Sequence, residues 1–109
     1  MHIQIVNFRL QGLAEADYAA ACDEMAQGFA AVPGLERKIW IANSETGTYG
    51  GVYIWRDRQA MEDYFETDLF NTVANHPNLV DMTSTDFDVM VAPTEVTNGM
   101  VGMPAVVTV

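Results

Sequence analysis

The sequence predicts a single α+β domain in which two helices cover one face of a four-stranded antiparallel sheet, in the order β-α-β-β-α-β. Three observations favour this fold. The chain has 109 residues, of which 50% are hydrophobic, and this is enough for one compact core but too little for two. Four segments alternate apolar and polar residues with the period of a strand. Two further segments carry apolar residues three or four positions apart, as amphipathic helices do.

The first strand and the first helix fill the first third of the chain. Apolar side chains alternate from His2 to Leu10, which predicts a strand with both faces partly buried. The alanine-rich segment from Ala14 to Ala31 predicts a helix, with an apolar stripe of Tyr18, Cys22, Met25, Phe29 and Val32. Pro33 and Gly34 end this helix, because proline lacks a backbone donor and glycine accepts a positive φ.

A β-hairpin is expected next. Its strands span Leu35 to Ala42 and Tyr49 to Arg56, and the residues between them are typical of a tight turn. Trp40, Tyr53 and Trp55 share one face of this hairpin, so we expect its large aromatic side chains to cluster.

The second helical segment begins after Asp57, whose carboxylate is a typical helix N-cap. Its apolar stripe consists of Ala60, Met61, Tyr64 and Phe65. A break near Thr67 is followed by a short helical turn. This turn ends at His76, because the residue before a proline avoids the helical region.

The last strand is expected from Thr83 to Ala92, and with it the element order becomes that of the ferredoxin-like fold. We therefore assign residues 1–93 to one domain. Residues 94–109 lack a helical period, and we expect them to leave the domain as an extended C-terminal arm. This arm would lie across a second copy of the chain through Met100, Val101, Met103, Val106 and Val107.

Charge and composition exclude several classes of partner and site. The 15 acidic residues against 5 basic ones give a net charge of −10, which repels nucleic acid. One cysteine, Cys22, cannot form an intramolecular disulfide, and two histidines are too few for a Cys/His metal cluster. No apolar stretch approaches the ~20 residues of a membrane span and no leader opens the chain, so we expect a cytoplasmic protein without membrane contact.

Two helices on one face of a sheet leave the other face uncovered. We expect this uncovered face to hold Ile3, Ile5, Trp40, Tyr53 and Trp55. An apolar patch of this size needs a second copy of the chain or a ligand to cover it.

Polar residues in the same strands favour a ligand chamber within that patch. They are Asn7, Arg9, Lys38 and Asp88. Burying an amide or an ion without a partner costs roughly 1 to 3 kcal/mol or more, so groups of this kind face a substrate, a water or one another. The alternative is that they form ion pairs across the strands or at a dimer seam.

Several short motifs in the predicted strands resemble those of the YdhR-type mono-oxygenases. They are Pro33-Gly34-Leu35, Lys38 with Trp40, Gly50-Gly51-Val52-Tyr53 with Trp55, and Phe87-Asp88-Val89, and the resemblance extends from Ile3 to Pro93. It implies a dimeric α+β barrel, a homodimer in which two sheets pack face to face. The same superfamily includes antibiotic-biosynthesis mono-oxygenases and oxygenases that work without metal or flavin.

This resemblance implies a cofactor-independent mono-oxygenase that oxidises a small aromatic or enolisable substrate with O2 in a pocket on the sheet face of the homodimer. Without a cofactor, the substrate must itself donate an electron, which a phenolate or enolate can do. We expect Lys38 and Arg9 to stabilise this anion, and Trp40, Tyr53 and Asn7 to orient its oxygens. Either His76 or Asp88 is the candidate base. Further candidates for substrate contact are Trp55, Ile5 and Tyr64.

Three alternatives remain open at this point. Haem degradation of the IsdG type would use Asn7, Tyr64 and His76, although that pattern has a tryptophan in place of Tyr64 and its histidine two positions earlier. An isomerase or cyclase would use similar acid–base residues without O2. A non-catalytic dimer that binds a small ligand would keep the same aromatic residues for packing and affinity only.

Overall fold

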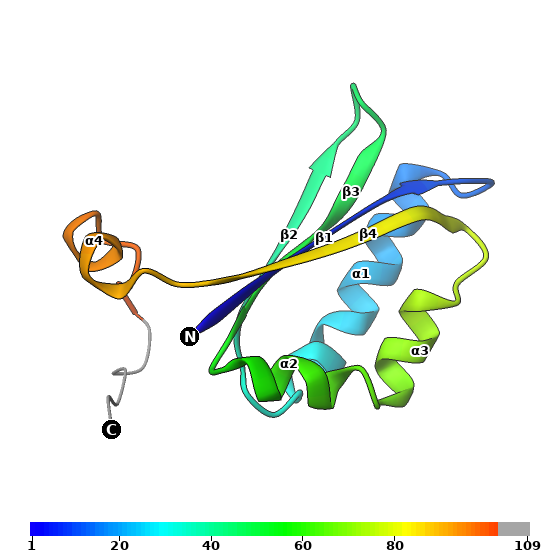
Figure 1. The fold of residues 1–109 in the computed structure, drawn as a ribbon. Coiled ribbons are helices and arrows are strands. Elements are labelled where there is room, and N and C mark those ends of the chain that lie inside the picture. Colours follow the sequence, from blue (N-terminus) through cyan, green and yellow to red (C-terminus); the bar gives the residue numbers. More distant parts are fainter. Residues whose placement is uncertain (103–109) are drawn as a thin grey trace.

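The computed structural model describes residues 1–102 and confirms the ferredoxin-like α+β fold. A four-stranded antiparallel sheet has the strand order β2-β3-β1-β4. Figure 1 shows α1, α2 and α3 on one side of this sheet, whereas α4 lies beyond the end of β4. The elements are β1 His2–Leu10, α1 Glu15–Ala30, β2 Leu35–Asn43, β3 Thr48–Trp55, α2 Arg58–Tyr64, α3 Asp68–Ala74, β4 Leu79–Asp88 and α4 Val91–Val96.

Side-chain caps define the two short helices that follow the hairpin. Asp57 caps α2 as predicted, because its Oδ1 accepts a hydrogen bond from the Ala60 N–H at 2.8 Å. Thr67 separates α2 from α3: its hydroxyl donates to the Tyr64 carbonyl at 2.6 Å and accepts from the Phe70 N–H at 3.2 Å. The second helical segment is therefore two helices with a capped joint.

The last strand begins and ends four residues earlier than predicted. β4 runs from Leu79, which pairs with Leu10, to Asp88, which pairs with His2. Because β1 begins at His2, no strand residue remains to pair with the chain beyond Asp88. The alternation up to Ala92 was therefore misleading, and Val91 begins α4 instead.

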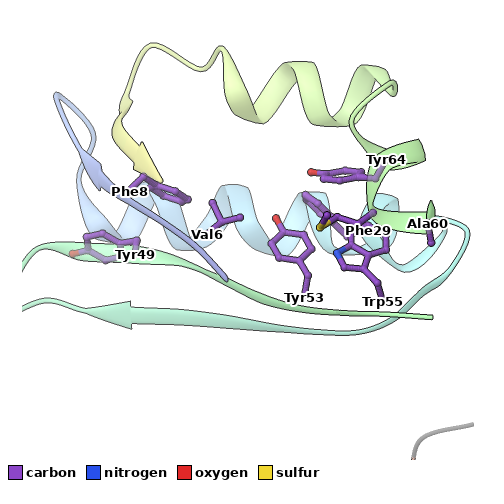
Figure 2. Packing of buried hydrophobic residues seen from close by; sticks show 9 residues of the cluster. Val6, Phe8, Phe29, Tyr49, Tyr53, Trp55, Ala60 and Tyr64 are labelled. Atoms are coloured by element: carbon purple, nitrogen blue, oxygen red, sulfur yellow. The ribbon is translucent and has the colours of Figure 1, made fainter. Parts of the chain in front are cut away.

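The hairpin aromatics lie beneath the helices, and our expectation that they line the uncovered face was wrong. In the sheet register Tyr53 lies opposite Gln4 and Trp55 opposite His2, and both β1 residues point toward the helices. Tyr53 is 3% exposed and Trp55 is fully buried. Figure 2 shows Tyr53 and Trp55 extending from β3 toward Phe29 of α1 and Tyr64 of α2. Burying several large rings together stabilises this arrangement.

The uncovered face is mainly aliphatic. As expected, Ile3 and Ile5 of β1 lie there, opposite Ile54 and Val52 of β3. On the same face, 48% of Ile39 and 53% of Phe87 is exposed, so this surface of the single chain is both apolar and open.

A backbone contact explains one of the two adjacent glycines of β3. A Cβ on Gly50 would lie 1.8 Å from the Val6 carbonyl oxygen, which no side chain can accommodate. The sheet therefore requires glycine at this position.

The segment after β4 contains a short helix, α4, where we expected an extended arm. Met90, Val96 and Val101 are exposed in it, and the Arg37 guanidinium donates to the Val101 carbonyl at 3.2 Å. Met103, Val106 and Val107 lie outside the described residues. The boundary at residue 93 and a contact of the arm with a second copy stay predictions. No helix within residues 1–102 is long and apolar enough to cross a membrane.

Candidate functional site

A cavity lies between α1 and the helix-facing side of the sheet, inside one copy of the chain. Its volume is about 60 Å³, and its lining is mostly apolar. The groups with chemical potential in this lining are Tyr18, Cys22, Lys38, Trp40, Tyr53 and His76. A shallower groove of about 520 Å³ beside it shares Tyr18, Cys22 and Trp40. The cavity alone has space for a few waters at roughly 10–15 Å³ each, so a substrate would use the groove as well.

Lys38 is held in this cavity by aromatic rings. It lies on β2 opposite Tyr53, and its side chain points to the helical side of the sheet. The Nζ atom is 3.3 Å from the centroid of the Phe29 ring, 3.5 Å from that of Trp40 and 4.7 Å from that of Tyr53. Contacts of this kind are typical of a cation–π site.

Gly51 leaves the space that the lysine stem occupies. A Cβ at this position would lie 3.0 Å from Lys38 Cε and 3.2 Å from the Tyr53 ring, closer than ordinary van der Waals contact. Gly50 and Gly51 therefore have different tasks: the first permits the backbone to approach Val6, and the second makes room for Lys38.

No carboxylate forms a salt bridge with Lys38 among the described residues. Burial lowers the pKa of Lys38 from 10.5 to about 7, and the nearby Cys22 opposes this shift to a smaller extent. The amine therefore changes between its charged and neutral forms near neutral pH. The alternative of an ion pair across the strands is therefore not realised for Lys38 among residues 1–102.

The tyrosines around the cavity are hydrogen-bond donors rather than anions. Burial raises the pKa of Tyr53, and the neighbouring Tyr64 raises it further. Burial raises the pKa of Tyr64 to about 12, and burial also raises the pKa of Tyr18. All three keep their protons at neutral pH.

His76 lines the cavity from the loop after α3. Its Nδ1 accepts a hydrogen bond from the Asn78 N–H at 3.2 Å. In the neutral ring this bond leaves the proton on Nε2, because one imidazole nitrogen accepts while the other donates. His76 in this state offers the cavity a donor and has no free lone pair for a base.

The other predicted site residues lie away from the cavity. Ile5, Asn7 and Arg9 point to the uncovered face, where the Arg9 guanidinium donates to the Thr46 carbonyl at 3.1 Å. Asp88 Oδ1 lies 3.0 Å from His2 Nδ1, so this carboxylate is a poor candidate for the base. The placement of Asn7 also separates it from Tyr64 and His76, with which the haem alternative groups it.

Trp55 and Tyr64 belong to the core behind the cavity. The buried Trp55 indole donates to the Gln4 side-chain oxygen at 3.1 Å, and Gln4 in turn donates to the Ser84 hydroxyl at 2.9 Å. Tyr64 packs against Trp55 and contacts Phe29 and Tyr53, which line the cavity, from behind.

Sequence reasoning missed two features of this side of the sheet. Tyr18 and Cys22 line both the cavity and the groove, although their helical spacing assigned them only to the core. His2 is 3% exposed and joins β1 to β4, with its Nε2 2.6 Å from Asp86 Oδ2 and its Nδ1 3.0 Å from Asp88 Oδ1.

The arrangement suits a small aromatic molecule that carries an ionisable oxygen. Ring faces of Phe29, Trp40 and Tyr53 supply apolar contact, and Lys38 supplies an amine. A mostly apolar pocket with a few polar groups is typical of small-molecule sites. No group of three His, Cys, Asp or Glu side chains within residues 1–102 could hold a metal ion.

Comparison with protein families gives one match over most of the chain. The family described as "Putative mono-oxygenase ydhR" matches residues 3–100. No curated protein sequence matches significantly.

Solved structures of low sequence identity share the fold. An antibiotic-biosynthesis mono-oxygenase described as putative, from Deinococcus radiodurans, is 15% identical, with a TM-score of 0.68 over 82% of this chain and 92% of that one. SnoaB, a cofactor-independent oxygenase from Streptomyces nogalater, is 18% identical, with a TM-score of 0.64 over 81% and 92%. A variant of MhuD with two manganese protoporphyrin IX molecules bound per active site is 15% identical, with a TM-score of 0.68 over 84% and 96%.

Proposed function

The chain belongs to the YdhR family of putative mono-oxygenases, and from this premise we propose that it oxidises a small phenolic or enolisable compound with O2 and without a cofactor. One observation carries the proposal. A single amine faces a ring-lined, mainly apolar cavity and has no carboxylate partner among residues 1–102. Such a site can hold one organic anion, which is the form of substrate that this chemistry needs.

The chemistry depends on forming that anion in a dry place. Dioxygen is a triplet and reacts slowly with closed-shell molecules, but a phenolate or enolate can transfer one electron to it. The apolar lining limits water around the anion, so the Lys38 charge interacts with it more strongly than it would in bulk solvent.

We assign substrate roles to four residues of the cavity. Lys38 is the counter-ion of the bound anion, and Trp40 and Tyr53 contact the substrate ring and its oxygens. His76 lines the same cavity and has Nε2 as its donor, because its Nδ1 accepts from the Asn78 N–H. Asn7, Arg9, Ile5, Trp55 and Asp88 have no assigned contact with substrate, because they lie outside the cavity lining.

We also propose that two copies of the chain associate through their uncovered sheet faces in the cytoplasm. The exposed apolar side chains of Ile39 and Phe87 support this interface, since water-exposed patches of this kind favour association. In this arrangement each copy contains a complete cavity of its own, and Asn7 and Arg9 belong to the interface.

Oxygen uptake with an easily oxidised hydroquinone, 1,4-dihydroxynaphthalene, tests the proposed function. The protein should raise the uptake rate above the rate in buffer, with and without a metal chelator. Lys38→Met should remove the increase, whereas Arg58→Met, which removes one cation from the exposed face of α2, should retain it. Uptake that stays at the buffer rate with a panel of such phenols would contradict the proposal.

Three alternatives keep a separate test. A haem-degrading activity is supported by the porphyrin-bound neighbour, and it predicts a Soret shift when haem is added. An isomerase or cyclase would convert its substrate under argon. A protein that only binds its ligand would show saturable binding of the phenol without oxygen uptake.

A further inference from the structure

The chain contains one lysine, Lys38, and this lysine lies in the cavity rather than on the surface. We propose that Lys38 approaches the substrate as a neutral amine and is the general base that removes its phenolic or enolic proton. This inference rests on the proposed function and adds a proton-transfer step to it. It also replaces His76 and Asp88 as candidates for the base.

The surroundings of the amine favour a base over a permanent cation. A lysine that serves only as a fixed charge normally has a carboxylate partner or water around it. Lys38 Nζ instead has three aromatic rings within 4.7 Å, whose cation–π attraction offsets only part of the cost of burying the charge. No described residue forms a salt bridge with it. Before substrate binds, the charged form of Lys38 is an ammonium in a mostly apolar cavity. Burial therefore lowers the pKa of Lys38.

The same surroundings stabilise the product of proton transfer. In the step, the substrate O–H bond breaks and a new N–H bond forms on Lys38, while the electron pair stays on the substrate oxygen. The reaction changes a neutral amine and a neutral phenol into an ammonium and a phenolate, without any change in net charge. Aromatic ring faces attract the new ammonium, and the phenolate supplies its counter-ion.

The tyrosines and His76 around the amine do not compete for this task. Those that face or adjoin it are Tyr18 and Cys22 from α1, Tyr53 from β3, Tyr64 from α2 behind Tyr53, His76 after α3, and Glu36 and Arg37 on its own strand. The tyrosines keep their protons at neutral pH because burial raises their pKa values. His76 has its lone pair occupied by the Asn78 N–H.

Geometry also holds the amine in place for this reaction. The missing side chain of Gly51 leaves room for the Lys38 stem, and Phe29 and Trp40 fix the position of Nζ. A base held at one position loses little freedom when the substrate binds, which favours proton transfer.

The first test measures the titration of Lys38 directly and uses the unchanged protein. Because the chain has one lysine, protein labelled with ¹³C-lysine gives one side-chain signal in an NMR spectrum. We expect its Cε shift to titrate near pH 7, as the lowered pKa of about 7 implies. A midpoint near the ordinary value of ~10.4 would overturn the proposal.

The second test follows the proton on a bound probe, 3-nitrophenol, whose anion absorbs visible light. The pH is set about one unit below the pKa of this phenol and above that of Lys38. We expect the wild-type protein to bind the probe as the anion and release almost no proton to the buffer. Lys38→Arg keeps a cation but cannot accept the proton. Each 3-nitrophenol molecule that this variant binds as the anion should therefore release about one proton to the buffer. Arg58→Met is the matched control and should behave like the wild type.

The outcomes separate this inference from the proposed function, because neither test uses O2. Binding of neutral 3-nitrophenol, or release of one proton by the wild-type protein, would overturn Lys38 as the base. If the protein takes up oxygen but Lys38 titrates with a midpoint near pH 10, the proposed mono-oxygenase function stands and the role of Lys38 as the base is wrong. If the protein binds 3-nitrophenol as the anion but consumes no oxygen with any phenol, the role of Lys38 as the base stands and the proposed mono-oxygenase function is wrong.

Discussion

Replacing Lys38 with methionine should change how the stability of the protein depends on pH. The unfolded chain binds a proton at Lys38 up to the ordinary pKa of 10.5, whereas the folded protein releases this proton near pH 7. Between these values the unfolded state holds more protons, so the free energy of unfolding rises as the pH rises. Below pH 7 both states bind the proton, and the burial cost of the ammonium is fully present. The lowered pKa of a lysine therefore destabilises the protein at low pH, and this effect disappears toward pH 10.5.

The size of this effect depends on the pH range over which the folded and unfolded states differ by one proton at Lys38. One proton difference changes the free energy of unfolding by about 1.4 kcal/mol per pH unit. From about pH 7.5 to about pH 9.5 the upper limit is therefore roughly 2 to 3 kcal/mol, and solvent near the cavity mouth reduces it to about 1 to 2 kcal/mol. We expect the wild-type protein to gain this amount relative to Lys38→Met over the same two pH units.

Urea unfolding of both proteins at the two pH values measures this difference. Subtracting the values of Lys38→Met removes the contributions of other titrating groups, including the tyrosines with raised pKa values. Arg58→Met should track the wild-type protein, because an exposed arginine does not titrate in this range. An equal stability difference between wild type and Lys38→Met at both pH values would refute the reasoning.

Three further predictions concern the sheet and the cap of α2. Gly51→Ala should fold but displace the Lys38 stem, and oxygen uptake should fall at least tenfold. Gly50→Ala should fail to fold stably, because its Cβ meets the Val6 carbonyl. Circular dichroism measures the folding of both variants, and the uptake assay measures their activity. Phe87→Glu should shift sedimentation toward a monomer by placing a charge on the apolar face, and an unchanged dimer would count against that interface. Asp57→Ala should lower the free energy of unfolding by about 1 kcal/mol in urea titrations, through loss of the α2 cap, and no change would show that water replaces it.

Alternation and helical spacing predicted the elements well because they depend on local geometry. The period of two in β1 and β3 and the stripe of Tyr18, Cys22, Met25 and Phe29 in α1 reflect which side chains share a face. The Asp57 cap is equally local, since it spans three residues. β4 was displaced because its end depends on where its partner strand begins, which is information from the other end of the chain.

Alternation did not show which face of the hairpin joins the helix-covered face of β1, and this put Lys38, Trp40, Tyr53 and Trp55 on the wrong side, although Ile3 and Ile5 of β1 lie where expected. The covered face of β1 carries His2 and Gln4 beside Val6 and Phe8. Its polarity is satisfied by partners far along the chain: Gln4 bonds to Trp55, and His2 to Asp86 and Asp88. These contacts allow the face with two polar side chains to be the buried one.

The pairing of β2 with β3 brings Lys38, Trp40, Gly51 and Tyr53 together. Lys38 lies opposite Tyr53 and Trp40 opposite Gly51, so the register brings the amine, its rings and the space for its stem to one place. A substitution in this unit that enlarges Gly51, or removes a ring beside Nζ, changes the environment of the amine without touching the uncovered face. The chemistry of the cavity and association through the sheet are therefore separable by mutation, because they use opposite sides of the same strands.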